Sequence, residues 1–326
     1  MKKNIAIVMG GYSSEVNISL QSGAVVYKHL NKEKYNAYKV HILPHKWVVV
    51  DTDETEYTID KNDFSFSKNT TKITFDCVFN AIHGNPGENG SLLAYFNLIK
   101  MKHTSAPFYQ MALTFNKRDS LSVVKHYGIP TAKSVYINKG DKFCKDEIVQ
   151  KVGLPCFVKP NNAGSSYGIS KVYTIETLTP AIEKAYKEDS EILVESFLDG
   201  TEVSVGVIQY KGETTVLPIT EIVSENDFFD YEAKYLGKSK EITPARLTKE
   251  QEGKVREIAK KVYDLLNMSG FSRSEFIIVH DEPHFLEMNT VPGLTEASIL
   301  PQQANEVGIS LTELFENAIE MALNND

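Results

Sequence analysis

Cysteine is scarce in this chain. The three cysteines, Cys77, Cys144 and Cys156, are odd in number and widely spaced. Disulfide frameworks and structural zinc sites use closely spaced, paired cysteines, so this pattern excludes both as a basis for the fold. Thiols in mostly apolar surroundings are typical of reduced core cysteines. The sequence therefore predicts a cytoplasmic protein.

Long hydrophobic runs are also absent. A membrane-spanning helix needs ~20 predominantly apolar residues, and no segment approaches that length. The apolar run at residues 5–9 follows two lysines, but two glycines end it well short of a secretion signal. We expect neither a membrane span nor a signal peptide.

Concentrated positive charge is missing as well. The net charge is −8 and no block of lysine or arginine stands out, which argues against binding to nucleic acid. The apolar content of 42% and the charged content of 24% are those of a globular protein. A length of 326 residues indicates two or three domains, each of roughly 100–150 residues.

Residues 1–105 alternate strands and helices in the manner of an open α/β domain. A buried strand at 4–9, a helix to about Leu30 and a strand at 38–43 form a βαβ unit. Another buried strand is predicted at 75–82, and a helix follows it.

Two glycine-bearing loops of this domain, at 10–14 and 83–90, follow strand ends. Ligands bind at the carboxyl ends of the strands in such sheets. The spacing G-x-G-x-x-G is absent, so the sequence does not favour a dinucleotide as that ligand.

A glycine- and serine-rich loop at 159–168 joins two short strands, which predicts a hairpin with an extended tip. Its backbone N–H groups, its hydroxyls and Lys159 suit a triphosphate. The loop is not a Walker A motif, because the lysine precedes the glycines and a strand comes next. A plain hairpin tip explains the loop equally well.

The rest of the middle region carries a few charged residues in apolar elements. A helix is predicted at about 112–127, and Lys117 within it has the position of a surface lysine. Strands are predicted at 192–195 and 203–207, with a turn between them at 199–200.

Glu195 and Glu202 lie near the ends of these two strands. Solvated edge charges and ligand contacts are both consistent with that position. Phe197 and Leu198 between them could form an apolar slot for an adenine ring.

Residues 219–247 show no clear periodicity. A segment of this length inside a compact domain is usually a functional lid or disordered, and its aromatic residues favour a lid. A long helix is predicted at 249–267, and the last helix opens with a capping box at Ser310 and Glu313.

Two strands near the C-terminus present oxygen ligands at one place. Glu275 ends up beside Glu287 if the strands pair as a hairpin, and Asn289 shares the face of Glu287 because side chains alternate along a strand. Two carboxylates and an amide oxygen suit Mg²⁺ or Mn²⁺, which often bind to one or two carboxylates plus substrate phosphates. Ordinary surface acids on an exposed hairpin are the alternative.

Taken together, these motifs resemble the ATP-grasp superfamily and, more narrowly, the D-alanine–D-alanine ligases, nearly end to end. The order and spacing of the motifs carry the resemblance: Gly10-Gly11-x-Ser13-x-Glu15, His83-Gly84-x-x-Gly87-Glu88-x-Gly90, Lys159-Pro160 with Gly164-Ser165-Ser166, Glu195, Glu202, Tyr231-Glu232-Ala233-Lys234-Tyr235, Arg273-x-Glu275, and Glu287-x-Asn289-Thr290-x-Pro292-Gly293-x-Thr295.

The resemblance implies a three-domain ATP-grasp fold of the α/β class. An open parallel α/β domain at 1–105 would be followed by two α+β domains, at 106–195 and 196–326, that sandwich ATP. The third would carry the lid loop 219–247 and the metal site. Members of the family are usually dimeric through the first domain, so the resemblance also implies a homodimer.

For the nucleotide, the resemblance implies a set of contacts to ATP and to Mg²⁺ or Mn²⁺. Phosphates would be held by Lys117 and Lys159, and by Lys234 once the lid closes. Glu195, Phe197 and Leu198 would bind adenine, and Glu202 the ribose. The metal ligands would be Glu275, Glu287 and Asn289.

For the substrates, the resemblance implies ligation of two D-alanine molecules through a D-alanyl phosphate, as used in peptidoglycan precursor synthesis. Glu15, aided by His83, would receive the ammonium group of the first D-alanine, and Ser298 the carboxylate of the second. Arg273 and Gly293 would be the oxyanion donors, and Ser165 and Tyr235 would join Glu15 in closing the lid.

The sequence departs from the family pattern in three places. Val16 stands where the family commonly has arginine, Asn89 where it has aspartate, and Glu275 where most members carry aspartate. A D-alanine–D-lactate or D-alanine–D-serine ligase remains an alternative, because such enzymes differ mainly in the second acceptor. The run ending in Tyr235 is similar to that of the dipeptide-forming enzymes. A nucleotide-binding module without catalysis and a different carboxylate–amine ligase are further alternatives.

Overall fold

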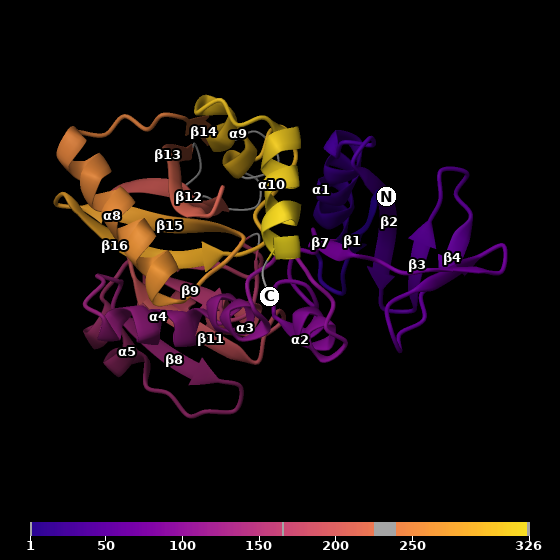
Figure 1. Ribbon diagram of the computed structural model, residues 1–326. Helices are drawn as coiled ribbons and strands as arrows, with labels where there is room; N and C mark the ends of the chain where they lie inside the picture. The colour runs from indigo at the N-terminus through magenta and orange to yellow at the C-terminus, as the bar shows by residue number, and fades with distance from the viewer. Residues whose placement is uncertain (1, 165, 225–238, 325–326) are drawn as a thin grey trace.

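The computed structural model describes residues 2–164, 166–224 and 239–324. Three main sheets organise this part of the chain, and a two-stranded sheet of β5 (Phe66–Lys68) and β6 (Thr71–Ile73) accompanies the first. In Figure 1 the N-terminal sheet lies to one side, and the other two sheets lie one above the other.

The first sheet has the strand order β4-β3-β2-β1-β7. Its strands are β1 (Lys3–Gly10), β2 (Tyr35–Leu43), β3 (Lys46–Val50), β4 (Glu56–Thr58) and β7 (Cys77–Asn80). β1 pairs in parallel with β2 and β7, and α1 (Val16–His29) makes the crossover of the predicted βαβ unit. β7 is shorter than the strand predicted at 75–82, and α2 (Ser91–Leu98) follows it.

The second sheet is antiparallel, with the order β10-β9-β11-β8. Its strands are β8 (Ser134–Asn138), β9 (Cys156–Pro160), β10 (Ser170–Val172) and β11 (Glu191–Ser196). α5 (Lys145–Val152) and α6 (Ile175–Ala185) pack on it, and a separate apolar core forms there because both helices bury aliphatic side chains against the strands.

The third sheet has the order β14-β13-β12-β15-β16. Its strands are β12 (Thr201–Tyr210), β13 (Glu213–Ser224), β14 (Ser239–Ile242), β15 (Phe271–Val279) and β16 (Glu282–Asn289). α8 (Lys249–Leu265) packs with Val203, Val205 and Val207 in one apolar cluster, whereas α9 (Ile299–Glu306) packs with Ile208 and Leu217 in another.

The last helix, α10 (Leu311–Asn324), ties the first sheet to the third. It packs against α1, β7 and β12, and the ring centroids of Phe315 and Phe79 are 5.6 Å apart. Figure 1 shows α10 standing between α1 and the third sheet. This packing fixes the first glycine loops relative to the strands that carry Glu275 and Glu287.

The helix predicted at 112–127 is wrong in one respect, because the structure has two helices there. α3 (Phe108–Phe115) ends at Asn116, whose side chain caps α4 (Lys117–His126) by accepting a hydrogen bond from the N–H of Asp119 at 3.0 Å. An asparagine cap favours a new helix start over continuation. The break puts Lys117 at the first position of α4, which packs against β16.

The turn predicted at 199–200 does not close a hairpin. β11 belongs to the second sheet and β12 to the third, so the segment between them crosses from one sheet to the other. A Cβ at Gly200 would lie 2.1 Å from the carbonyl oxygen of Ile278, which explains why this close crossing requires glycine. Glu195 and Glu202 therefore come from different sheets.

The segment at 219–247 is more regular at its two ends than the sequence predicted. β13 extends to Ser224 and β14 begins at Ser239, and the two strands pair. The part of the segment between them lies outside the described residues. None of the helices in the described ranges has the length and apolar character that crossing a bilayer would require.

Candidate active site

The predicted metal hairpin forms as β15 and β16. Glu275 lies directly opposite Glu287 in the antiparallel register, and Asn289 is the next residue on the same side of β16. The side-chain amide nitrogen of Asn289 is 3.5 Å from Oε1 of Glu275. The structure thus brings the three predicted metal ligands together.

Lys117 reaches this hairpin from α4. Its Nζ lies 3.1 Å from Oε2 of Glu287 and donates a hydrogen bond to the carbonyl oxygen of Ala163 at 2.7 Å. The side chain is 11% exposed, so this lysine is not the surface residue that its helix alone suggested. Ala163 belongs to the predicted phosphate loop. Lys117 therefore contacts both this loop and the metal hairpin.

Lys159 lies on β9, and its Nζ is 2.7 Å from Oε2 of Glu195 on the neighbouring strand. Burial by itself would lower the pKa of this lysine. The charges of Glu195, Glu287 and Glu202 outweigh burial and raise its pKa. Lys159 is therefore a buried, fully charged ammonium group suited to an anionic ligand.

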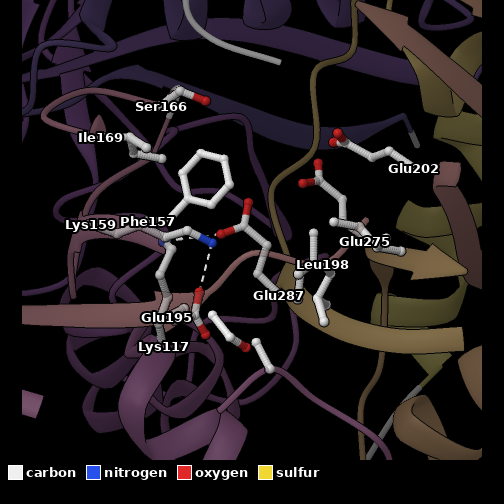
Figure 2. Close-up of a pocket in the computed structure, with 14 residues that line it drawn as sticks. Lys117, Phe157, Lys159, Ser166, Ile169, Glu195, Leu198, Glu202, Glu275 and Glu287 are labelled. Atoms are coloured by element: carbon white, nitrogen blue, oxygen red, sulfur yellow. Dashed lines mark ion pairs between the residues drawn. The ribbon is translucent and has the colours of Figure 1, made fainter. Parts of the chain in front are cut away.

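Figure 2 shows the cavity between the second and third sheets, with Lys159, Glu195 and Glu287 converging and Glu275 and Glu202 further across. Its lining residues are Lys117, Ala132, Phe157, Lys159, Ser166, Ile169, Glu195, Ser196, Leu198, Glu202, Glu275, Ile277, Leu286 and Glu287. A slot with an apolar end and a charged end has the character of a nucleotide site, because bases are apolar and flat and phosphates are anionic.

The apolar end of this cavity differs in detail from the predicted slot. Leu198 lines it, together with Phe157, which the sequence did not single out. Phe197 lies behind Phe157, with ring centroids 6.2 Å apart, and the Nζ of Lys171 is 4.2 Å from the centroid of Phe197. The backbone N–H of Phe197 donates to the carbonyl oxygen of Pro155.

A second cavity adjoins the first, and Glu287 lines both. Its lining residues are Glu15, Ile18, Gln21, His83, Glu88, Gly164, Glu241, Arg273, Glu287, Asn289, Val291, Pro292, Gly293, Thr295, Ala297, Ser298 and Ile299. The predicted substrate residues of the described chain therefore meet beside the predicted nucleotide site.

Glu15 lies at the start of α1 and is 7% exposed. A Cβ at Gly164 would lie 2.7 and 2.8 Å from its two carboxylate oxygens, and one at Gly84 would lie 3.0 Å from Oε2. A side chain at either position would therefore displace this carboxylate or the loop that carries the glycine. The phosphate loop and the His83 loop converge on Glu15 from two sides.

His83 is buried beside Glu15. Its Nε2 is 3.0 Å from the hydroxyl of Ser22, which also accepts a hydrogen bond from the N–H of Leu294 at 3.3 Å. Burial lowers the pKa of His83, although the charge of Glu15 acts in the opposite direction. Ser22 of α1 thus connects the neutral ring of His83 to the loop after β16.

Glu88 is a buried carboxyl group to which the sequence analysis gave no role. Its oxygens accept hydrogen bonds from the N–H groups of Gly84, at 3.0 Å, and Thr290, at 3.3 Å. Burial, followed by the charge of Glu15, raises its pKa to about 7. The signal in the sequence was its place in the His83-Gly84 motif, but its partner at Thr290 is 202 residues away.

Arg273 and Gly293 both line the second cavity. Arg273 donates a hydrogen bond to the hydroxyl of Ser204 at 2.8 Å and pairs with Glu275. A Cβ at Gly293 would lie 2.7 Å from the hydroxyl oxygen of Ser298, whose own partner is the hydroxyl of Thr295 at 2.8 Å. A side chain at position 293 would displace Ser298.

The donor set at 275, 287 and 289 fits a divalent cation that also binds phosphate. Among the described residues no group of three or more His, Cys, Asp or Glu side chains could hold a metal by itself. The two opposed carboxylates and the nearby amide supply a partial coordination shell that phosphate oxygens could complete. Glu275 in place of aspartate still faces Glu287 directly.

Ser165, Lys234 and Tyr235, three of the predicted site residues, lie outside the described ranges. Their neighbours Gly164 and Ser166 line the second and the first cavity, respectively.

Two family models match the chain. The family described as D-ala D-ala ligase N-terminus matches residues 4–106, and the one described as D-ala D-ala ligase C-terminus matches residues 123–320. A D-alanine–D-alanine ligase of Flavobacterium johnsoniae is 67% identical over 321 residues, which cover 98% of this chain and 99% of that protein.

Two of the solved structures that resemble this chain match it over nearly its full length. A D-Ala:D-Ser ligase of Enterococcus faecalis is 29% identical, with a TM-score of 0.85, and the match covers 99% of this chain and 100% of that one. A D-alanine–D-alanine ligase of Bacillus anthracis in complex with ATP is 25% identical, with a TM-score of 0.79, covering 98% and 97%. The predicted ATP-grasp fold is confirmed, and the chain belongs to the D-alanine–D-alanine ligase family.

Proposed function

We propose that this protein joins two D-alanine molecules to D-alanyl-D-alanine at the expense of ATP, as a step of peptidoglycan precursor synthesis. The observation that carries the proposal is the junction of the two cavities at Glu287, which places a predicted nucleotide site against a predicted amino-acid site. Phosphoryl transfer between two bound molecules needs such contact, because catalysis of this step is mainly positioning and charge stabilisation.

In the first step, a carboxylate oxygen of the donor D-alanine attacks the γ-phosphorus of ATP, and ADP leaves. Lys117 and Lys159 would hold the phosphates, which is supported by the burial of both side chains and by their position in the lining of the cavity. Glu15 would hold the donor's ammonium group, with His83 beside it. Glu202 would contact the ribose, and Glu195 and Leu198 the adenine ring, together with Phe157 or Phe197.

We further propose Mg²⁺ or Mn²⁺ at Glu275, Glu287 and Asn289. A bound divalent cation would neutralise charge on the phosphate oxygens during transfer. Glu275 and Glu287 are suited to this role because they face each other across the hairpin and both line the first cavity, where Glu287 pairs with Lys117.

In the second step, the ammonium group of the acceptor D-alanine loses a proton, and the resulting amine attacks the acyl carbon to give a tetrahedral intermediate. The carbon–oxygen bond to phosphate then breaks, phosphate leaves with the electron pair, and the nitrogen gives up its extra proton to solvent or to the leaving phosphate. Arg273 and the N–H of Gly293 would stabilise the oxyanion, and losing one such donor typically costs about 10²–10³ in rate. Ser298, at the start of α9, would hold the acceptor's carboxylate. Ser165, Lys234 and Tyr235 keep the lid roles that the resemblance implies.

An isotope experiment tests both steps together. D-alanine labelled with ¹⁸O at both carboxylate oxygens should give inorganic phosphate with one labelled oxygen and dipeptide with the other three, because one donor oxygen bridges carbon and phosphorus in the acyl phosphate and leaves with phosphorus. Mass spectrometry of both products checks this, with L-alanine as the control substrate. Dipeptide with unlabelled phosphate would rule out the acyl phosphate.

A D-alanine–D-lactate ligase is the second candidate, and the same assay separates it. Phosphate release with D-alanine alone should be fast, and added D-lactate should contribute little depsipeptide. Little turnover until D-lactate is added would favour the second candidate instead.

Three properties of the whole molecule complete the proposal. The division into domains at 1–105, 106–195 and 196–326 follows the three sheets approximately. A homodimer would have twice the chain mass of 36.6 kDa, which light scattering after size-exclusion chromatography would detect. A cytoplasmic location fits the absence of disulfides at Cys77, Cys144 and Cys156.

A further inference from the structure

Glu241 is an acidic residue of the second cavity that neither the sequence motifs nor the proposed reaction uses. It lies on β14, the edge strand of the third sheet. Charged residues on edge strands commonly serve to prevent sheet-to-sheet association. That explanation does not suit Glu241, because its side chain lines the cavity, whereas the preceding residue, Lys240, is exposed.

Strand pairing shows which part of the cavity Glu241 borders. It lies directly opposite Ile222 of β13, so the two side chains share one face of the sheet. Ile222 is buried against Ile299, the first residue of α9. Glu241 therefore borders the end of the cavity formed by Ser298 and Ile299, and not the end formed by α1.

Four carboxyl groups line the described part of this cavity, those of Glu15, Glu88, Glu241 and Glu287. Burial raises the pKa of Glu88 to about 7, and Glu287 pairs with Lys117 as Arg273 does with Glu275, so the negative charge of these walls comes mainly from Glu15 and Glu241. Two amino-acid substrates would bring two ammonium groups into this space. Glu15 accounts for one of them, and no residue of the proposed reaction accounts for the other.

We propose that Glu241 binds the ammonium group of the acceptor amino acid and so selects an amine over a hydroxy acid as the second substrate. This inference rests on the proposed function. D-lactate has the same carboxylate as D-alanine for Ser298 but no positive charge, so it enters a negatively charged pocket as a net anion. A carboxylate at 241 therefore favours D-alanine both by attraction of its ammonium group and by repulsion of D-lactate.

The test is a competition between acceptors. Enzyme, ATP and D-alanine are incubated with an excess of D-lactate, and the ratio of dipeptide to depsipeptide is measured by mass spectrometry. Both products share the donor, the ATP and the folded fraction of enzyme, so the ratio reports only on the acceptor step. Glu241→Gln should lower the ratio about tenfold, the factor that corresponds to about 1.4 kcal/mol.

Three comparisons make the result specific. Glu241→Asp, which retains the charge, should keep most of the wild-type ratio. Glu213→Gln, an exposed glutamate on β13 of the same sheet, should leave it unchanged. With D-serine as the competitor, Glu241→Gln should not shift the product ratio, because both acceptors then carry an ammonium group.

Initial rates against D-alanine give a second measurement. Glu241→Gln should raise the acceptor's KM about tenfold while the KM values of ATP and of the donor stay within twofold of the wild type. An unchanged product ratio with unchanged acceptor KM overturns the inference, as does an equal change in Glu213→Gln. If the wild-type enzyme forms no dipeptide at all, the proposed function fails, which is a different result from a Glu241 variant without effect.

Discussion

Oε2 of Glu287 lies 3.1 Å from Nζ of Lys117, so that a predicted metal ligand and a predicted phosphate ligand neutralise each other in the ligand-free protein. The same arrangement recurs twice nearby, because Lys159 pairs with Glu195 and Arg273 with Glu275. Within the described ranges, each of these three cations, which would meet a substrate anion, is held by a carboxylate. Binding of a nucleotide together with a divalent cation would exchange these partners without leaving a buried charge unpaired.

This pairing predicts opposite effects of Glu287→Gln on two forms of the nucleotide. ATP without a divalent cation should bind about tenfold more tightly to the variant, because a negative charge beside the phosphates is removed and Lys117 is released. ATP with Mg²⁺ should bind about tenfold more weakly, because a metal ligand is lost. Calorimetric titrations with EDTA or with Mg²⁺ measure both constants.

Glu282→Gln is the matched control, since this glutamate lies at the exposed start of the same strand. It should change neither constant. Turnover of Glu287→Gln should fall by about 10²-fold or more at an unchanged melting temperature. Equal changes in both nucleotide forms would contradict the exchange of partners.

The adenine end of the first cavity predicts a difference between two phenylalanines. Phe157 lines the cavity and Phe197 lies behind it. Phe157→Ala should raise the Kd of ATP about tenfold, because an aromatic wall beside the base is lost. Phe197→Ala should raise it less, about threefold, since it only supports Phe157.

Equilibrium titration with a fluorescent ATP analogue would separate the two phenylalanines, and thermal unfolding would check that both variants fold. A larger loss of affinity in Phe197→Ala than in Phe157→Ala would support the original sequence prediction, in which Phe197 borders the adenine ring.

The contact between the phosphate loop and Glu15 predicts the effect of Gly164→Ala. The added Cβ would lie 2.7 Å from Oε1 of Glu15, so either the loop or the carboxylate must move. The affinity for the donor D-alanine should fall about tenfold, while the protein stays folded. Trp47, the single tryptophan, donates a hydrogen bond to Tyr12 in the loop that precedes Glu15, so its fluorescence can follow the titration.

Gly253→Ala is the control for that variant. Gly253 lies within α8 and a Cβ there meets nothing within 4 Å, so alanine should raise the stability by up to about 1 kcal/mol and leave D-alanine binding unchanged. Wild-type affinity in Gly164→Ala would show that the loop does not constrain Glu15.

Glu88 predicts a pH dependence of stability. Its pKa is raised from 4.5 in an unfolded chain to about 7 by burial and by the charge of Glu15, so the folded state favours the protonated carboxyl. The contribution of Glu88 to stability is therefore complete below pH 4.5 and is lost as the pH rises through about 7. The loss is on the order of 3 kcal/mol, since one pKa unit corresponds to about 1.4 kcal/mol.

Glu88→Gln cannot ionise and should lack this loss. The variant should be less stable at low pH by about 1–2 kcal/mol, because one amide oxygen replaces two acceptors for the N–H groups of Gly84 and Thr290. Its disadvantage relative to the wild type should shrink as the pH rises above 5 and become an advantage of about 1–2 kcal/mol by pH 8, because the wild type loses about 3 kcal/mol over this range. Urea unfolding across this range measures the difference, and parallel pH profiles for the two proteins would refute the role of Glu88.

Much of the fold could be predicted because local signals were strong. The βαβ unit around α1 followed from a short apolar strand, a glycine turn and helical spacing, and the metal hairpin followed from alternation along two strands. The break at Asn116 was missed because a capping asparagine inside an apolar pattern is a weak signal. The crossing at Gly200 was missed because a turn in sequence does not say whether the next strand returns to the same sheet.

The sequence by itself indicated the kind of chemistry. Lys159 and the pair Glu275 and Glu287 were selected by residue type and spacing, whereas Lys117 was assigned to phosphate only by the resemblance. Only the tertiary structure decided which charges neutralise one another, that Glu88 is a buried acid bonded to Thr290, and that Glu241 lines the second cavity. Burial and long-range pairing set these properties, and both arise from the packing of distant segments.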